Sequence, residues 1–387
     1  MRRLAPLVLA LAAAGAAAFA LWPEPRVAGL STAATLPAVR AATTRTAALD
    51  DSTFAALIEG MSEQGRYFDT DNLISNESSY LHVMGALRER GVEGGAYIGV
   101  GPDQNFSYMG AIRPRIAFIV DIRRDNLLQH LFFKTLFELA PTRIEYVAYL
   151  FGRTPPRDPP EWTDRPLDRL IAWIDETPAD ADYVAGLRSA VLDHAGTLGV
   201  PLTADDLATI ARIHATFTNA GPDLRYSSHG RAPRPSYPTY RQLLFAADRD
   251  GNRANFLTSE DDYAFLRAMQ QNNLVIPVVG DFAGPHALRT IGEYVRNAGL
   301  SVSAFYLSNV EFYLWQDGLF DRFANNVATL PLDDRTTMIR SLFGRIYDHP
   351  QSLPGFNSTQ LVQDMAGFVA SFQAGRYETY GDLIYRQ

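Results

Sequence analysis

The pattern of apolar and polar positions predicts short buried strands separated by helices. Four apolar runs, at 96–100, 116–120, 274–279 and 302–307, are typical of strands buried on both faces. Apolar residues at helical spacing predict helices over 54–61, 75–90, 106–112, 126–139, 167–175, 182–198, 204–217, 265–271 and 287–298. Strand, glycine turn, helix, strand and helix form a βαβ pattern. We therefore expect the α/β class, with parallel strands and right-handed crossovers.

The same pattern divides the chain into segments. Residues 23–52 are rich in Ala, Thr, Pro and Arg and predict a flexible tether, followed by an α/β domain over 53–318. Within that domain, two proline-rich stretches bracket several helices and predict a helical insertion at about 154–235. Residues 319–387 are expected to form a helical extension that packs on the same domain.

The first 22 residues have the features of a secretory leader. Arg2 and Arg3 precede an uncharged run over 4–22, and Ala18-Phe19-Ala20 offers small residues for cleavage. If it is not cleaved, the run is nearly long enough to anchor the chain in a membrane. We therefore expect an exported protein, periplasmic or anchored in the membrane and facing the periplasm. Membrane contact is expected only through this segment.

Composition excludes several kinds of chemistry. The 387 residues contain 43 acidic and 35 basic side chains, and this acidic balance argues against a nucleic-acid partner. There is no cysteine, which removes disulfides, thiol catalysis and cysteine-based metal sites. The seven histidines form no HExxH pair, so we predict no metal site.

The stretch 96–121 carries the clearest indication of a binding site. Gly99-Val100-Gly101 follows the first predicted strand, where glycine lets backbone amides approach a ligand. Asp121 ends the second strand, 20 residues beyond Gly101, and an acid there can accept hydrogen bonds from ribose hydroxyls. On these residues the stretch resembles the nucleotide-binding half of the class I S-adenosylmethionine-dependent methyltransferases.

That resemblance implies a Rossmann-like, methyltransferase-type sheet and S-adenosylmethionine as the cofactor. The cofactor-binding residues that it implies are Gly99, Gly101, Gln104, Asn105 and Asp121. The ligand is expected in a cleft at the carboxyl ends of the strands.

Two positions depart from the methyltransferase pattern. Tyr97 stands two residues before the first glycine, where the family usually has an acid, and Asp103 occupies the third position of its glycine series. The sequences of residues 101–108 and 308–313 also resemble those of an exported bacterial family. This resemblance extends over roughly residues 67–314. This second resemblance supports the fold and implies no particular reaction.

Charged residues near the predicted strand ends are the first candidates for chemistry. Glu77 falls on the apolar stripe of its predicted helix, so it either lines a cleft or is a first-turn residue stabilised by the helix dipole. Asp281 follows the third strand, with His286 five residues on, which suits proton transfer; a satisfied loop histidine is the alternative. Arg123, after Asp121, is a candidate for holding an anion; the alternatives are a solvated side chain and a pair with nearby acids.

The fourth strand supplies the remaining candidates. If it continues through Tyr313, Asn309 and Glu311 point the same way at its carboxyl end, where open α/β sheets bind ligands. A solvent-facing edge strand is the alternative. The candidate catalytic residues are Glu77, Asp281 and Glu311, and the candidate substrate-binding residues are Asn76, Tyr108 and Asn309.

Three functions remain open at this point. The first is a methyltransferase-like protein that binds S-adenosylmethionine or a related nucleotide and a small-molecule substrate; whether it is an enzyme is undecided. Because this cofactor is cytoplasmic, the leader favours a second function, an exported non-catalytic ligand-binding or envelope-interaction protein on the same fold. The third is a metal-assisted hydrolase in which Asp281, Glu311 and Glu77 hold Mg²⁺ or Ca²⁺.

Overall fold

The computed structural model describes residues 47–228, 234–343 and 349–385. The leader predicted at 1–22, and the predicted tether up to residue 46, lie outside these ranges. Within them, no helix has both the length and the apolar character needed to cross a bilayer.

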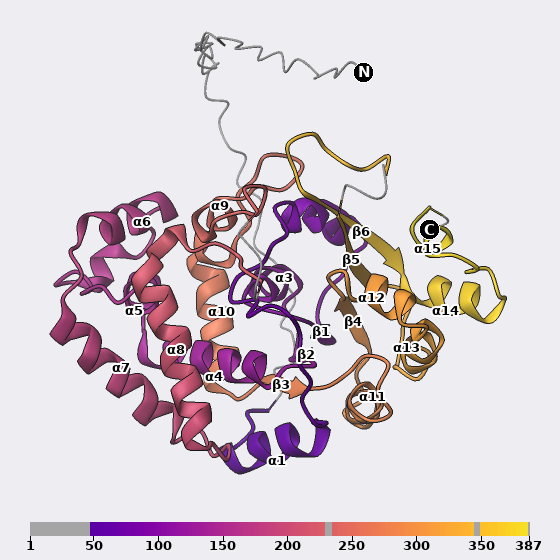
Figure 1. Ribbon diagram of the computed structural model, residues 1–387, viewed down its shortest axis with the longest axis horizontal. Coiled ribbons are helices and arrows are strands. Elements are labelled where there is room, and N and C mark those ends of the chain that lie inside the picture. Colours follow the sequence, from indigo (N-terminus) through magenta and orange to yellow (C-terminus); the bar gives the residue numbers. More distant parts are fainter. Residues whose placement is uncertain (1–46, 229–233, 344–348, 386–387) are drawn as a thin grey trace, which may run out of the picture. The chain divides into compact units, whose positions relative to one another are not determined.

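The strands form one mostly parallel sheet in the order β3-β2-β1-β4-β5-β6 (Figure 1). Its members are β1 (Ala96–Gly99), β2 (Ile116–Asp121), β3 (Val275–Val279), β4 (Val302–Tyr306), β5 (Thr337–Phe343) and β6 (Ser358–Asp364). Strands β1 to β5 are parallel, and β6 runs antiparallel to β5. The predicted α/β class and the four predicted strands are confirmed.

Helices cover both faces of this sheet (Figure 1). On one face lie α3 (Gln104–Ile112), α4 (Arg124–Leu139) and α10 (Glu260–Gln271). On the other lie α1 (Asp51–Met61), α11 (Ala287–Asn297) and α13 (Phe320–Val327). The ring of Phe118 on β2 meets Tyr294 on α11 at 5.8 Å, and Phe305 on β4 meets Phe323 on α13 at 6.4 Å. The sheet is therefore buried on both sides, as its uninterrupted apolar strands require.

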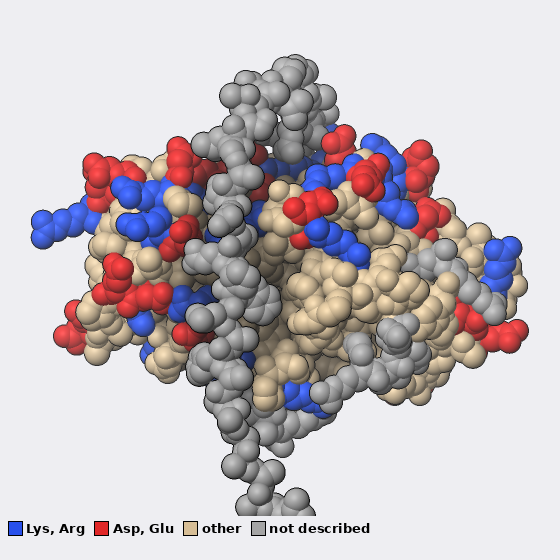
Figure 2. Space-filling model, turned by 90° about the horizontal axis from the view of Figure 1, so that it is seen from above, with Lys and Arg blue, Asp and Glu red and all other residues tan. Residues whose placement is uncertain are grey.

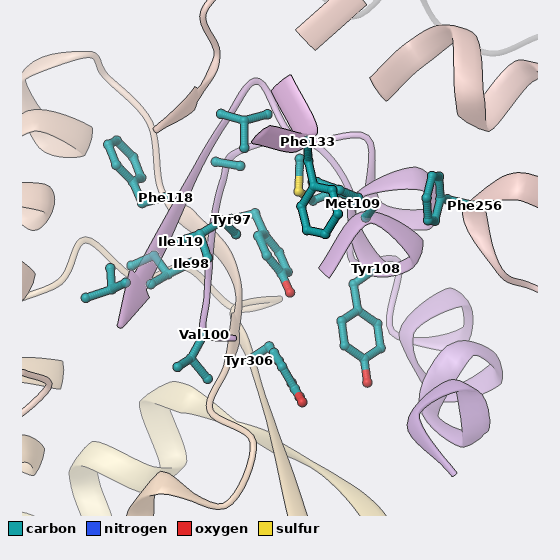
Figure 3. Close-up of a cluster of buried hydrophobic side chains, with 14 of the residues drawn as sticks. Tyr97, Ile98, Val100, Tyr108, Met109, Phe118, Ile119, Phe133, Phe256 and Tyr306 are labelled. Atoms are coloured by element: carbon teal, nitrogen blue, oxygen red, sulfur yellow. The ribbon is translucent and has the colours of Figure 1, made fainter. Parts of the chain in front are cut away.

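Aromatic side chains fill the layer between the sheet and α3 (Figure 3). Phe106 lies edge-on to Phe133, Phe137 and Phe256, with ring centroids 5.4–5.7 Å apart. Such edge-to-face pairs contribute roughly 0.5–1.5 kcal/mol each beyond the area that they bury. This packing fixes α3, and with it the turn that joins β1 to α3.

The helical insertion packs against α4. Its members within the predicted range are η2 (Pro159–Trp162), α6 (Leu167–Glu176), α7 (Ala181–Ala195), α8 (Ala204–Ala220) and η3 (Gly221–Asp223), preceded by α5 (Arg143–Leu150). Phe217 of α8 stacks on Phe132 of α4 with centroids 6.2 Å apart. Residues 44–387 form one compact unit, so the insertion belongs to the same body as the sheet. Two short elements, α9 (Tyr240–Leu244) and η4 (Phe256–Thr258), lead back to α10.

Residues 319–387 differ from the mainly helical extension that we predicted. They contain α13, α14 (Met365–Gln373) and α15 (Tyr380–Tyr385), but also β5 and β6, which complete the sheet. Both strands carry polar residues at buried positions, among them Arg340 and Gln360, and so lack an apolar run. Arg340 pairs with Glu311 and Gln360 donates to Glu77, partners in other segments that hydrophobic periodicity cannot indicate.

The helix predicted from Ser75 begins later. Residues 75–79 are irregular, followed by η1 (Tyr80–Val83) and α2 (Met84–Glu89). The Ser79 hydroxyl donates to the carbonyl oxygen of Ser358 on β6 at 2.6 Å, and Ser78 bonds to Asn357. These contacts hold the segment against the edge of the sheet, so it does not close a helical turn.

Candidate functional site

The strand order places a topological switch point between β1 and β4. From β1 the chain continues to β2 and β3 on one side, and from β4 to β5 and β6 on the other. In open α/β sheets, ligands bind in the crevice outside the carboxyl ends of the strands at this point. Here those ends contribute the turn after β1, which contains Gly101, and the turn after β4, which contains Ser308.

Asn105 closes the glycine turn from within. Its side-chain amide donates to the carbonyl oxygens of Val100 at 2.9 Å and Pro102 at 2.7 Å, and its Oδ1 accepts from the Tyr97 hydroxyl at 2.8 Å. A Cβ atom on Gly99 would lie 2.0 Å from that Oδ1. Asn105 and Gly99, both predicted to bind cofactor, therefore shape the turn itself, and Tyr97 holds Asn105 in place.

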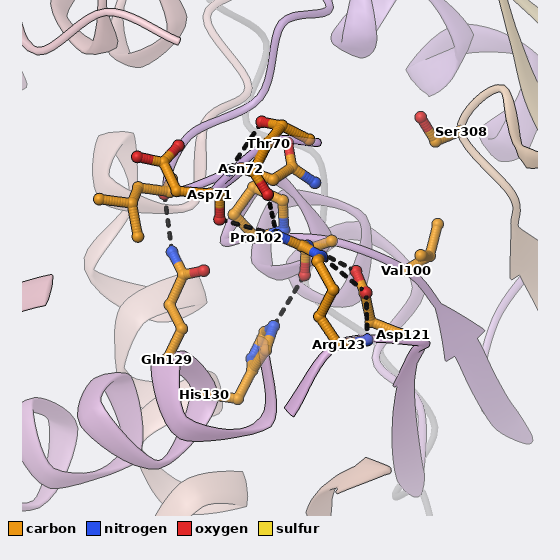
Figure 4. A network of polar contacts seen from close by, with 12 residues as sticks. Thr70, Asp71, Asn72, Val100, Pro102, Asp121, Arg123, Gln129, His130 and Ser308 are labelled. Carbon is orange, nitrogen blue, oxygen red and sulfur yellow. Dashed lines mark hydrogen bonds and ion pairs between the residues drawn. The ribbon is translucent and has the colours of Figure 1, made fainter. Parts of the chain in front are cut away.

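His130 supports the same turn from α4 (Figure 4). Its Nε2 lies 2.8 Å from the carbonyl oxygen of Gly101, whose φ of +78° suits glycine. Because a carbonyl only accepts, Nε2 carries the proton. Burial lowers the pKa of His130 to about 4, so the ring is neutral near pH 7.

Replacing His130 by Gln is expected to weaken the loss of stability on acidification. A histidine with a folded-state pKa below its unfolded value stabilises the fold above about pH 6.5, and this stabilisation is lost as the pH falls toward 4. Between pH 7 and pH 5 the wild-type residue should account for a loss of about 2 kcal/mol. Urea unfolding at both pH values measures it, and an unchanged pH dependence in the variant would contradict the assignment. His214 on α8 also has a pKa lowered to about 4 by burial, so His214→Gln is a second, independent test and should reduce the loss by a similar amount.

Asp121, the predicted ribose acceptor, has an internal partner. Arg123 Nε donates to its Oδ1 at 2.9 Å and Nη2 to its Oδ2 at 2.7 Å, and both side chains are buried. Arg123 Nη1 also donates to the carbonyl oxygens of Thr70 and Asp71 (Figure 4). Of the interpretations of Arg123, pairing with a nearby acid is the one that agrees with these contacts.

Glu77 is the centre of a buried hydrogen-bond network at the switch point. It is 1% exposed and accepts at Oε2 from the Tyr306 hydroxyl at 2.7 Å and from Gln360 Nε2 at 2.8 Å. The Ser308 hydroxyl donates to its Oε1. Burial raises the pKa of Glu77, and these donors oppose the rise. Since Glu77 precedes η1 and lies outside any helix, stabilisation by a helix dipole is not its role.

Gln104 extends this network toward the glycine turn. Its Nε2 donates to the Tyr306 hydroxyl at 3.1 Å, so Tyr306 accepts from Gln104 and donates to Glu77. The Oε1 of Gln104 is buried and has no hydrogen-bond partner among the described residues. Gln360 and Tyr306 were not predicted. Gln360 lies in a polar stretch without an apolar pattern. Tyr306 belongs to an apolar run, which predicts a buried core residue and not a site residue.

The predicted pair of Asp281 and His286 does not form a proton-transfer unit. The Asp281 carboxylate pairs with Arg66 at 2.8 Å and accepts from the backbone N–H of Ala283. The His286 ring lies 2.7 Å from the carbonyl oxygen of Gly60. The alternative that we gave for His286, a satisfied loop histidine, agrees with these contacts.

Asn309 and Glu311 do not share a strand face. Strand β4 ends at Tyr306, the chain turns at Ser308 with φ of +52°, and Glu311 lies on α12 (Val310–Gln316). Glu311 forms a buried bidentate pair with Arg340 of β5, at 2.7 and 3.2 Å. The predicted continuation of the strand is wrong, and Glu311 has a structural partner.

The remaining substrate candidates lie near the switch point in supporting positions. Tyr108 is fully buried, donates to the carbonyl oxygen of Tyr80 at 2.6 Å, and packs on the Tyr306 ring with centroids 5.0 Å apart (Figure 3). Asn76 is half-buried, and its carbonyl oxygen accepts from Asn357 at 2.8 Å. The described part of the chain contains no group of three His, Cys, Asp or Glu side chains that could hold a metal ion.

One cavity that the described residues define lies away from the switch point. This cavity of about 620 Å³ opens beside the end of β6 and the start of α14. Its lining residues are Arg90, Gln351, Val362, Gln363, Asp364, Gly367, Ser371 and Arg376. None of them is a predicted site residue. On the face in Figure 2, acidic and basic side chains are interspersed, without a field of one sign.

Comparison with known proteins gives a family without a stated activity. A family model described as "Domain of unknown function (DUF7790)" matches residues 72–153 and 205–385. The match includes all six described strands, Glu77, the glycine turn and Gln360. It omits residues 154–204, which contain η2, α6 and α7 of the helical insertion. No curated protein matches the chain.

Proposed function

Because the chain belongs to the DUF7790 family of domains of unknown function, we propose a function from the site itself. In this proposal the chain is a methyltransferase-like protein that binds S-adenosylmethionine or a related nucleoside at the carboxyl ends of β1 and β4. The strand order 3-2-1-4-5-6 supports this position, since Rossmann-like sheets bind ligands at that switch point. The observation that carries the proposal is the pair of buried acceptors there, Glu77 and Gln104.

These acceptors suit the charged end of the proposed ligand. S-adenosylmethionine carries a protonated amine and a sulfonium, and both are stabilised by a nearby carboxylate and by oxygen acceptors. The amine can donate to the unpartnered Oε1 of Gln104, while Glu77 balances the positive charge. An unpartnered buried acceptor costs about 1–3 kcal/mol, which a donor from the ligand would recover. Methyl transfer depends mainly on in-line positioning and needs no strong nucleophile from the protein.

Glu77→Gln is expected to weaken S-adenosylmethionine binding at least 10-fold. The substitution keeps the size of the side chain and removes its charge, so the loss of a charge-assisted interaction is measured directly. Isothermal titration of the purified full chain with S-adenosylmethionine, S-adenosylhomocysteine, adenosine and methionine gives the affinities. Glu59→Gln, on the exposed side of α1, is the control and should bind as the wild type does.

Two outcomes would contradict the proposal. One is a folded wild-type chain that binds none of the four ligands. The other is a folded Glu77→Gln variant with unchanged affinity. If the chain binds adenosine and S-adenosylmethionine with equal affinity, the protein has a nucleoside site, but Glu77 does not contribute to binding in the way proposed.

A second function, exported ligand binding without catalysis, is favoured by the Asp121–Arg123 pair. In this closed arrangement, the acid that would hold a ribose is already bound by a guanidinium. The leader predicted at 1–22 supports the same interpretation, because S-adenosylmethionine is made in the cytoplasm. Binding of adenosine or methionine alone, with no methyl transfer from bound S-adenosylmethionine to any acceptor, would favour this second function.

A further inference from the structure

Residues 62–79, which we call the strap, run along the carboxyl edge of the sheet. At β3 the strap bonds through the Glu63 N–H, which donates to the carbonyl oxygen of Val279 at 2.7 Å. Beyond β2, the Arg66 N–H donates to the carbonyl oxygen of Ile122 at 2.7 Å. The strap then passes the glycine turn and ends at Glu77 and Ser79, which bond to β4 and β6. It therefore follows the track on which the proposed ligand would lie.

The first part of the strap is held by charged contacts. The Glu63 carboxylate accepts from the backbone N–H groups of His286 and Ala287, each at 3.0 Å, and of Asp281 at 3.2 Å. The N–H groups of His286 and Ala287 lie at the start of α11, where the helix dipole favours an anion. Arg66 adds the ion pair with Asp281. Two backbone hydrogen bonds and these contacts of the charged side chains of Glu63 and Arg66 thus hold residues 63–66.

The strap is divided into an exposed part and a buried part. Residues 64–67 are exposed, with Tyr67 at 77%, whereas Thr70, Leu73 and Ile74 are buried at 5% exposure or less. Arg123 binds the carbonyl oxygens of Thr70 and Asp71, and Gln129 Nε2 donates to that of Leu73 at 2.7 Å (Figure 4). Residues 70–79 are therefore anchored. None of residues 63–69 is buried, and lifting them separates the ring of Phe68 from that of Tyr313, whose centroids lie 5.3 Å apart.

Polar atoms at this edge lack partners in the closed arrangement. Asn126 and Gln129 lie on one face of α4, and both polar atoms of Asn126 and the Oε1 of Gln129 are buried without a partner among the described residues. Gln104 Oε1 is a further example on α3. Buried polar groups without partners destabilise the arrangement that contains them. A ligand that supplied hydrogen bonds here would therefore compete well with the closed strap.

We propose that residues 63–69 are a lid that lifts from β2 and β3 when the ligand enters, and that the described structure is the closed state. This inference rests on the proposed function, because it places the ligand under the same edge. On opening, Glu63 leaves the N–H groups at α11, and Arg66 releases Asp281. Asp121 and its partner Arg123 then lie next to the vacated track, where a ribose could reach them.

A disulfide lock tests the lid. A Cβ atom on Gly65 would lie 3.7 Å from the Cβ of Arg124, close to the spacing of about 3.8 Å that a disulfide needs. The chain has no cysteine, so Gly65→Cys with Arg124→Cys creates the only thiol pair. Oxidation should lower the affinity for S-adenosylmethionine at least 10-fold, and dithiothreitol should restore it. Arg124→Cys alone controls for the lost Arg124–Asp206 pair and should not respond to oxidation.

Hydrogen exchange tests the motion without any ligand. In the reduced double variant, the N–H groups of Glu63 and Arg66 should exchange at least 100-fold faster than those of β2, and the disulfide should abolish the difference. Exchange of both sets at one rate would overturn the lid, as would equal ligand affinity in oxidised and reduced protein. If the reduced protein binds none of the ligands but its N–H groups at Glu63 and Arg66 exchange fast, the proposed function is wrong and the lid motion still stands.

Discussion

Arg340→Met is expected to lower the free energy of unfolding by about 3–5 kcal/mol. The Glu311–Arg340 pair is 2–3% exposed on both side chains, so removing the guanidinium leaves a carboxylate buried without its counter-charge. Met keeps much of the volume of the arginine stem and limits the effect of an empty cavity. Urea unfolding at pH 7 measures the difference.

The double substitution Arg340→Met with Glu311→Leu separates charge from packing. Because removing both partners leaves no isolated buried charge, most of the stability should return. The double variant should bind the ligand as the wild type does, since Glu311 lies on α12 and contacts β5 rather than the glycine turn. A double variant as unstable as the single one would contradict the electrostatic explanation. A stable double variant without ligand binding would restore Glu311 as a site residue.

The sequence predicts those parts of the fold in which local pattern and burial agree. Strands β1 to β4 are buried on both faces and made almost wholly of apolar residues, so each appears as an apolar run. Strands β5 and β6 are mostly buried too, but Arg340 of β5 and Gln360 of β6 have polar partners. Those partners, Glu311 and Glu77, belong to other segments. Polar side chains that are buried because they have polar partners leave no hydrophobic periodicity in the sequence. Both strands were therefore missed.

The candidate site was predicted in part for the same reason. Glu77 was correctly placed on the buried side, although the helix used to place it begins later. Its partners Tyr306 and Gln360 come from strands more than 200 residues away. Glu311 was misplaced because the alternation rule assumes a continuing strand. The chain instead leaves β4 through Ser308 in the left-handed region, a conformation that Ser seldom adopts and that its neighbours did not indicate.

Gly99→Ala is expected to lower the free energy of unfolding by about 3–5 kcal/mol through overpacking and lost hydrogen bonds. The new Cβ would lie 2.0 Å from Asn105 Oδ1 and 2.8 Å from Tyr97 Cε1, so Asn105 must leave its position. The carbonyl groups of the turn would then lose their donor. Urea unfolding measures the change. Gly60→Ala is the control: nothing lies within 4 Å of its Cβ position on α1, and Ala should stabilise that helix by about 0.5–1 kcal/mol.

A double-mutant cycle with Asn105→Ala identifies the cause. If Gly99 is required because Asn105 approaches it so closely, the two substitutions share one loss, and the double variant should be more stable than the sum of the single effects by about 1–3 kcal/mol. Additive effects would instead place the conflict at Tyr97, whose ring remains in the double variant. A Gly99→Ala chain as stable as Gly60→Ala would mean that the turn does not depend on Asn105. The glycine would then be left for a ligand, as the methyltransferase resemblance implies.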